Sequence, residues 1–490
     1  MRRLWSVLQQ PRVWCEFVLA CALLAALLAW HDLPLVDLPQ HALQIQNWIK
    51  LDHADPSVHA FELNLRTPYL LGYVAVRALA GWLDVLLALK LVLWAAVVLQ
   101  VRALTWLAQR LGHSAWFGLL GFPLGLGYSF CWGFVSFCAA VPLIYLGFGA
   151  AHAQREAPSL RRGALLAGVL SLLLVAHGVA FGFTALLLGP MFLARPKRLV
   201  LGAWPFGVPV LLGLLWLAPE RTRLGGDVWR FEPERFLELP GQLVGSGSGD
   251  LFATGLGLAL LAVLMVNLGP LRSRMAAVPL LVAVLGYALF PTLFRGAGPL
   301  GPRFAAFIVP AALLAFSPDA EASQRSWSSV LAGLASISVL VFSLRLCLFQ
   351  RESRDFHALI EEMPRGMSVR PLVFDRGGRA FPGLPSFLHF PAYYALQKGG
   401  SAGYSFAMYS ISVVRLRTGE RIKMWGGAEW TPWTFNWARE QADYDYFMVR
   451  SSSDRAPELF GTASAPVSLE QHAGDWWGYT KGSLDAALRY

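Results

Sequence analysis

Charged residues are scarce in this chain of 490 residues, of which only 15% are charged while 56% are hydrophobic. A soluble protein of this length needs a larger charged share to cover its surface with polar groups. Apolar segments of roughly 15 to 22 residues recur instead, and this length is typical of membrane-spanning helices. The composition therefore excludes an ordinary soluble protein and predicts a mainly α-helical, polytopic membrane protein.

Cysteine is also rare, with five in the chain and none after Cys347. The five cysteines lie in or beside apolar segments without metal-ligand spacing, so we interpret them as small buried hydrophobic residues and predict no disulfide framework. The sequence also lacks a phosphate-binding glycine loop, because "GGSAGYSF" has the wrong spacing and no strand before it.

The net charge of +10 could suggest nucleic acid, but the basic residues are distributed as a membrane topology requires. Many of them fall in short loops after every second apolar segment, and short cytoplasmic loops of membrane proteins are enriched in lysine and arginine. We therefore expect no nucleic-acid partner. The loop clusters are Arg102 and Arg110; Arg155, Arg161 and Arg162; Arg195, Lys197 and Arg198; and Arg272 and Arg274.

The spacing of the apolar segments predicts about eleven transmembrane helices. The basic N-terminus followed by an apolar run, without a clear cleavage site before His31, indicates an uncleaved signal anchor. With that end inside, all four basic clusters become cytoplasmic and the C-terminal region lies outside the bacterial inner membrane. The predicted spans are 14–30, 85–101, 115–130, 133–150, 163–177, 178–194, 199–217, 251–268, 275–293, 304–316 and 327–348.

One further apolar segment, 67–82, would invert every later loop if it crossed the membrane. It carries Arg77 in its middle and Trp82 at its end, and both residue types are stable at a membrane interface. We therefore predict an interfacial helix within the first outer loop, 31–84. The glycine- and serine-rich "GSGSGD" in the outer loop 218–250 fits either a mobile loop over a site or a plain linker.

The composition becomes polar towards the C-terminus, which predicts a transmembrane domain over 1–350 and a small extracytoplasmic α/β domain over 351–490. In this second domain a polar helix covers 352–363. Strands are expected in "MSVRPLVF", "YDYFMVRS" and "DWWGYTK", and a glycine-capped helix in "FLHFPAYYALQKGG".

The first outer loop holds the most informative acid, Asp37, which directly precedes "LPQHALQIQNW". An aspartate before a proline in the first helical turn is a good N-cap, so capping alone could explain it. At the mouth of a membrane protein the same carboxylate could act as a base, with His41 one turn later on the same face. The Asp- and His-rich stretch 52–62 fits no metal motif, and we expect a solvated loop there and no metal site.

Two arginines, Arg295 and Arg303, lie on the predicted outer side, against the positive-inside trend. Arg303 directly abuts an apolar span, where a guanidinium needs an anion such as a lipid phosphate or pyrophosphate. The alternative is an arginine that contacts ordinary lipid headgroups.

The order of these features resembles the GT-C superfamily of integral-membrane glycosyltransferases, especially bacterial members that act outside the cytoplasmic membrane. The resemblance covers most of the chain and depends on the order of its motifs rather than on any single one. It runs through "VDLPQHA", the interfacial "TPYLLGY", "CWGFVSFCAAVPLIYLGFGAAHAQR", "AHGVAFGF", "GPRFAAFIVPAALLAF" and a final outer domain with "DWWGYTK".

The resemblance implies a polyprenyl-phosphate-linked sugar as donor, Asp37 as general base and Arg303 at the donor phosphate. We expect Arg295 to assist Arg303, and His41, Arg66 and His177 to line the cavity. A lipid phosphate is already a good leaving group, so one carboxylate and one or two arginines suffice, and the scheme requires neither metal nor cofactor. A single in-line displacement would invert the anomeric centre.

Two other functions remain open at the level of sequence: a transporter or flippase of lipid-linked glycans, and a non-catalytic subunit of an envelope assembly complex. A transporter should carry charged residues deep in its spans, whereas the central spans here are almost free of charge. The sequence does not specify the sugar, the linkage or the oligomeric state. It also leaves open whether the acceptor is a glycan, a lipid or a protein.

Overall fold

The protein forms two compact units, each assembled from two separate parts of the chain. The computed structural model describes residues 10–193, 199–217, 229, 234–247, 249–291, 298–319, 327–420, 429–463 and 467–481. The first unit comprises Met1–Ala29 and Asn64–Leu344, and the second comprises Trp30–Leu63 and Arg345–Tyr490. The predicted boundary at residue 350 differs from this division, because residues 30–63 fold with the C-terminal part of the chain.

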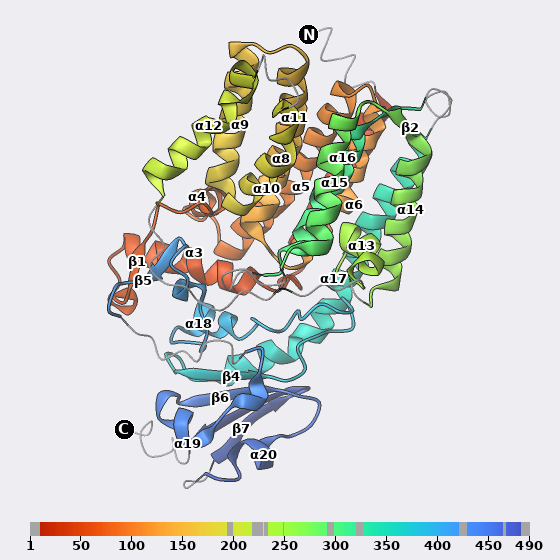
Figure 1. Cartoon of the computed structure of the whole chain (residues 1–490). Helices are drawn as coiled ribbons and strands as arrows, with labels where there is room; N and C mark the ends of the chain where they lie inside the picture. The colour runs from red at the N-terminus through yellow and green to blue at the C-terminus, as the bar shows by residue number, and fades with distance from the viewer. Residues whose placement is uncertain are drawn as a thin grey trace. The chain divides into compact units, whose positions relative to one another are not determined.

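The first unit is almost entirely helical (Figure 1). A short antiparallel pair, β2 (Leu268–Leu271) with β3 (Phe316–Pro318), joins two of its loops. Its helices are α2 (Pro11–Ala29), α4 (Leu70–Leu79), α5 (Val85–Arg110), η2 (Ala115–Leu120), α6 (Gly121–Gly125), α7 (Tyr128–Cys131), α8 (Val135–Glu156), α9 (Leu160–Ala176), α10 (Gly178–Leu188), α11 (Pro190–Leu193), α12 (Leu199–Trp216), α13 (Arg235–Val244), α14 (Leu251–Asn267), α15 (Arg274–Leu289), η4 (Gly301–Phe304), α16 (Ala305–Ala315) and the first part of α17 (Ser328–Glu362).

A large apolar cluster lies between the helices of this unit. Leu104 of α5, Ile144 of α8 and Leu170 of α9 are fully buried in it. Helix α5 packs on α8, α8 packs on α9, and α9 packs on α12, as Figure 1 shows for the last pair. Polar caps satisfy the exposed backbone N–H groups at several helix starts, as Asp84 does for α5 and Asp250 for α14.

The helices agree with the predicted polytopic fold, although the count of eleven spans remains a prediction. Among the described residues, four helices are long and apolar enough to cross a membrane, namely α2, α5, α8 and α17, and the other apolar helices there are shorter. The ten residues of α4 extend only about 15 Å, half of a bilayer core, which agrees with its omission from the spans.

Two predicted elements differ in detail, and one helix was missed. The segment 115–130 is divided into η2, α6 and α7, and the chain becomes extended at Gly127 before α7 begins. A side chain at Gly127 would meet the carbonyl of Leu243, so the break allows a close approach to α13. Helix α13 itself was not predicted, and the polar run 352–363 is no separate helix but the end of the 35-residue α17.

The second unit carries a mixed four-stranded sheet in the order β4-β6-β8-β7 (Figure 1). Strand β4 (Val369–Val373) pairs in parallel with β6 (Tyr446–Arg450), while β8 (Trp476–Lys481) pairs antiparallel with β6 and β7 (Val467–Ala473). This confirms the three predicted strands, and β7 was missed. The other elements are α3 (Leu38–Asp52), η1 (Pro56–Val58), β1 (Phe61–Leu63), α18 (Ala392–Lys398), η6 (Phe406–Met408), β5 (Val414–Leu416), η7 (Pro432–Thr434), α19 (Trp437–Glu440), η8 (Gln441–Asp443) and α20 (Ala456–Phe460).

Helix α3 belongs to this unit because it contacts elements from the C-terminal part of the chain. It packs on α18, and the chain that follows it forms β1, which pairs antiparallel with β5. The Gln44 side chain of α3 also accepts the backbone N–H of Val414 at 2.9 Å. Residues far apart in sequence thus place Asp37, at the start of α3, among C-terminal side chains.

Candidate active site

Asp37 occupies the N-cap position of α3, but its carboxylate makes no capping hydrogen bond. Its Oδ1 lies 3.6 Å from Nε2 of His389, and this imidazole is buried while the aspartate side chain is 14% exposed. The simpler interpretation of Asp37 as a helix cap is therefore insufficient. The acid is directed at a buried histidine that the sequence analysis did not single out.

Aromatic rings surround His389 and fix its orientation. The ring of Tyr404 stacks on it at 5.2 Å between centroids, and Phe406 contacts both His389 and His41 edge to face. The side chain of Gln40 donates to the carbonyl of Tyr404 at 3.1 Å and accepts the N–H of Phe406 at 3.3 Å. These two bonds tie the first turn of α3 to the loop that carries the aromatic residues.

Burial and the neighbouring His41 lower the pKa of His389 to about 3, so its imidazole is neutral at physiological pH. The contact with Asp37 is therefore between a carboxylate and a neutral ring rather than an ion pair. A neutral imidazole that is held by stacked rings can orient a carboxylate without neutralising it.

A second carboxyl group, Glu429, lies close enough to Asp37 for the two to interact electrostatically. Burial raises the pKa of Glu429 to about 8, with Arg370 opposing this and Asp37 adding to it. Glu429 therefore keeps its proton at neutral pH, which avoids repulsion between two buried negative charges. The hydroxyls of Tyr404 and Tyr409 lie 2.9 Å apart near the same acids, and burial raises the pKa of both.

The first unit contains the predicted arginine, Arg303, in the short helix η4. It is buried, donates to the carbonyls of Pro299 and Gly298 at 3.2 and 3.1 Å, and its guanidinium carbon lies 4.0 Å from the ring centre of Phe134. These contacts hold the planar group in one orientation. Its Nη1 lies 3.4 Å from Nε2 of His177, so the structure brings two of the predicted residues together.

The hydrogen bonds of His177 assign its tautomer. Ala180 donates its backbone N–H to Nδ1 of His177 at 3.2 Å, which caps helix α10. In the neutral ring the proton must therefore lie on Nε2, the nitrogen that faces Arg303. Two donors that face each other cannot satisfy one another, and an anionic oxygen between them would accept from both.

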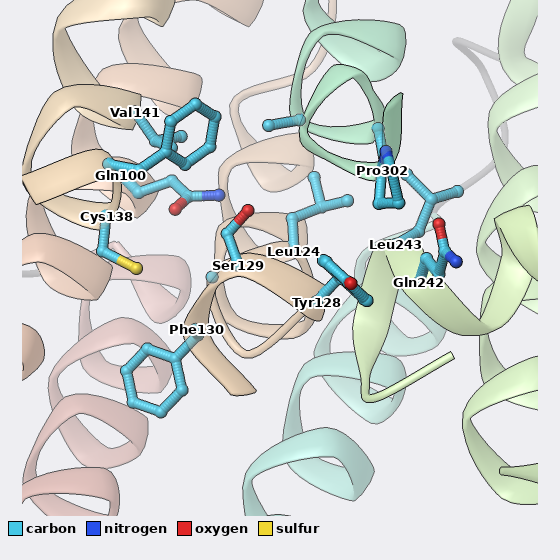
Figure 2. A pocket seen from close by; sticks show the side chains of 14 residues that line it. Gln100, Leu124, Tyr128, Ser129, Phe130, Cys138, Val141, Gln242, Leu243 and Pro302 are labelled. Carbon is cyan, nitrogen blue, oxygen red and sulfur yellow. The ribbon is translucent and has the colours of Figure 1, made fainter. Parts of the chain in front are cut away.

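A small apolar cavity lies in the same unit (Figure 2). Its few polar side chains include Gln100, Ser129 and Gln242, and most of the rest of its surface is hydrocarbon. Phe137 lines the cavity and also contacts His177 edge to face at 5.2 Å. Pro302, the neighbour of Arg303 in the chain, forms part of the wall. The ring of Phe137 thus contacts both the apolar cavity and His177, one of the two hydrogen-bond donors.

The remaining predicted residues fall outside these two groups or outside the described residues. Arg66 is exposed and donates from Nε to the carbonyl of Trp216 at 2.7 Å, at the end of α12. Arg295 lies outside the described residues. In the stretch 52–62, Asp55 accepts the N–H of Ser57, and Glu62 pairs with Arg415 at 2.8 Å.

Within the described part of the chain, one group of side chains has the composition and spacing of a metal site. It lies at residues 31, 32 and 357, and not in the stretch 52–62. The sequence offered no motif for it, because its third member is more than 300 positions from the other two.

No protein-family model matches this sequence, and no curated protein matches it either. Among solved structures, the chain is similar to the crystal structure of ArnT from Cupriavidus metallidurans in the apo state. The TM-score is 0.51 at 12% sequence identity, and the match covers 95% of this chain and 97% of ArnT. The comparison shows that the chain shares the fold of ArnT, which agrees with the polytopic helical membrane protein that the sequence predicted.

Proposed function

We propose that this protein is a membrane glycosyltransferase that moves a sugar from a polyprenyl-phosphate donor to an acceptor hydroxyl on the extracytoplasmic face. The observation that carries the proposal is Asp37, whose carboxylate stands at a helix start without capping it and contacts a neutral, buried histidine. The GT-C fold supports the same class of activity, since ArnT shares it.

In this mechanism the carboxylate of Asp37 removes the proton of the acceptor hydroxyl as that oxygen attacks the anomeric carbon. His389 orients the carboxylate, and the protonated Glu429 leaves Asp37 as the negative group of the pair. The bond between the anomeric carbon and the phosphate oxygen breaks, and the lipid phosphate departs with the electron pair. One displacement of this kind inverts the anomeric centre.

Arg303 and His177 stabilise the negative charge of the phosphate. The guanidinium and the Nε2–H are fixed by their other hydrogen bonds, so they need little rearrangement when charge develops on the leaving group. The apolar side chains beside Phe137 would contact the first isoprene units of the donor. The protein's own side chains supply both the base and the phosphate site, and the scheme uses no metal.

The proposal is tested by replacing Asp37 with asparagine in the full-length protein, reconstituted in liposomes with a panel of polyprenyl-phosphate sugars and a cell-envelope extract as acceptor. The release of polyprenyl phosphate should fall by about 10²–10⁴-fold, the usual contribution of a general base. Asp52→Asn, at an exposed position of the same helix, is the matched control and should keep full activity.

Wild-type release of polyprenyl phosphate by the Asp37→Asn variant would rule out this mechanism. Movement of intact lipid-linked glycan across the liposome bilayer, with no cleavage by the wild-type protein, would favour a flippase instead. Loss of a bound partner without either activity would favour an assembly subunit.

A further inference from the structure

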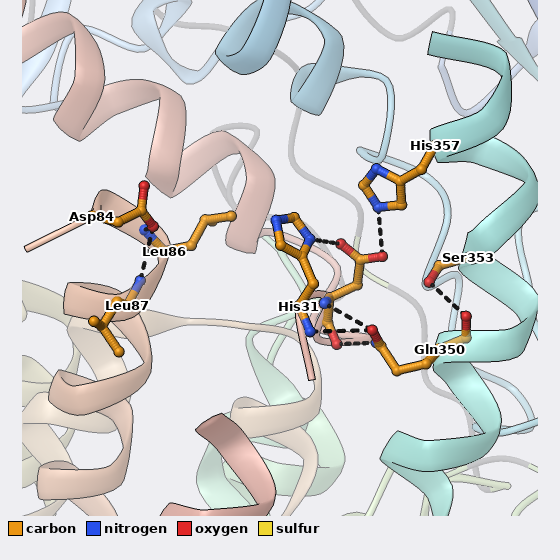
Figure 3. A network of polar contacts seen from close by, with 8 residues as sticks. His31, Asp84, Leu86, Leu87, Gln350, Ser353 and His357 are labelled. Carbon is orange, nitrogen blue, oxygen red and sulfur yellow. Dashed lines mark hydrogen bonds and ion pairs between the residues drawn. The ribbon is translucent and has the colours of Figure 1, made fainter. Parts of the chain in front are cut away.

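Three metal-ligating side chains converge in the second unit, at the segment that leads to α3 (Figure 3). Nδ1 of His31 lies 2.8 Å from Oδ1 of Asp32, and Nε2 of His357 lies 2.7 Å from Oδ2 of the same carboxylate. The three ligand atoms lie within 4.8 Å of one another. Two imidazoles therefore approach one carboxylate from both of its oxygens.

The surroundings hold these side chains in place. The Gln350 side chain of α17 donates from Nε2 to the carbonyl of Asp32 at 2.7 Å and accepts the backbone N–H of His31 at 3.2 Å. The Asp32 side chain is 1% exposed, while those of His31 and His357 are 59% and 30% exposed. The carboxylate is thus fixed in the interior, and one side of the cluster is open to water.

We propose that His31, Asp32 and His357 bind one divalent transition-metal ion of the zinc class. Two imidazole nitrogens and one carboxylate oxygen are ligands of intermediate softness that suit Zn²⁺, and water can complete a four-coordinate site. Ligand atoms about 2.0–2.2 Å from a tetrahedral ion lie roughly 3.3 Å apart. The nitrogens of His31 and His357 lie 2.8 and 2.7 Å from different oxygens of Asp32, and the ligand atoms lie within 4.8 Å of one another. Rotation of the imidazoles about their side-chain bonds would bring both nitrogens to this spacing from one carboxylate oxygen.

The consequence of metal binding concerns the segment between Asp32 and Asp37. An ion bound to His31, Asp32 and His357 joins the start of this segment to α17 within the second unit. It would fix the chain five residues before the proposed base, while the ion itself stays outside the transfer chemistry. This consequence rests on the proposed function, whereas the binding of the ion does not.

The test measures metal directly in the purified full-length protein. After equilibration with Zn²⁺ and removal of free ions, elemental analysis should find about one zinc per chain, and Co²⁺ should give the visible absorption of a four-coordinate site. His31→Ala and His357→Ala should each weaken binding by at least about tenfold. Gln350→Ala should weaken it less, because it positions a ligand without touching the ion. His53→Ala removes an exposed histidine at the C-cap of α3 and should bind as the wild type does.

The proposal is overturned if the wild-type protein keeps no stoichiometric zinc, or if His31→Ala and His357→Ala bind it as tightly as His53→Ala does. It is also overturned if the melting temperature of these variants lies equally far below that of the wild type with and without Zn²⁺. That result would indicate that the two histidines only form hydrogen bonds with Asp32. His31 is exposed, so its variant should elute as a folded protein in gel filtration. Asp37→Asn should keep its zinc, which separates this test from the test of transfer.

Discussion

At the scale of single residues, the neighbours of a few buried side chains determine the chemistry of those side chains. His177 both caps α10 through Nδ1 and faces Arg303 through Nε2. Because asparagine is also a good N-cap, His177→Asn should preserve the helix start while it removes the Nε2–H donor. We expect the variant to bind the lipid-linked sugar more weakly. Its KM for the polyprenyl-phosphate sugar should rise by about tenfold.

Arg303→Lys should have a larger effect on turnover than on folding, because lysine keeps the charge but not the planar set of donors. We expect kcat/KM to fall by about 10²-fold in the same liposome assay, as for the loss of a stabilising donor at a leaving group. Arg110→Lys, at the exposed end of α5, is the control. Unchanged kinetics for Arg303→Lys would contradict a phosphate-binding role.

Glu429 makes a specific prediction about the pH dependence of stability. Its pKa rises from 4.5 to about 8 on folding, so between these values the native state binds more protons than the unfolded state. The stability that Glu429 contributes is therefore complete below about pH 4.5 and is lost as the pH rises towards 8. Glu429→Gln should raise the melting temperature relative to the wild type at pH 8, with a smaller difference at pH 5. Equal differences at both pH values would contradict a protonated Glu429.

At the scale of elements, a buried ion pair connects β4 to the end of α19 in the second unit. Nε of Arg370 lies 2.7 Å from Oε2 of Glu440, and the two side chains are 3% and 1% exposed. Removing one partner leaves an uncompensated buried charge, so Glu440→Ala should destabilise the protein by about 3–5 kcal/mol. Thermal unfolding of the detergent-solubilised protein measures this loss.

The exposed pair of Arg455 and Glu458 supplies the control for that measurement, since its side chains are 35% and 59% exposed. Glu458→Ala should change the stability by less than about 1 kcal/mol. Replacement of both Arg370 and Glu440 with apolar residues should cost less than Glu440→Ala alone. An equal loss from the buried and exposed single variants would contradict the importance of burial here.

At the scale of the whole molecule, the distribution of arginine and lysine predicts the topology. With the N-terminus inside, the second unit lies outside and the turn before α9 lies in the cytoplasm. In a variant without the native cysteines, Ser452→Cys should react with a membrane-impermeant maleimide in intact spheroplasts. Arg161→Cys should react only after the membrane is opened, and both positions are exposed on the protein surface. The reverse pattern would invert the proposed orientation of the active site.

The sequence by itself determined the class of this protein and most of its helices. Long apolar segments have few alternatives to helices in a bilayer, because the backbone polar groups must be satisfied within each segment. Short apolar runs marked the strands that became β4, β6 and β8. Local signals of this kind depend on neighbours in the chain, which is why they could be read without a structure.

Only the tertiary structure decided what surrounds the predicted residues. The local sequence predicts Asp37 as a helix cap, whereas in the structure its carboxylate makes no capping hydrogen bond and lies 3.6 Å from His389. His389, Glu429 and His357 carry no spacing motif, since each meets its partner across more than 300 residues. Such contacts arise because apolar burial brings distant segments together. The chemistry of a side chain then depends on neighbours that no local pattern contains.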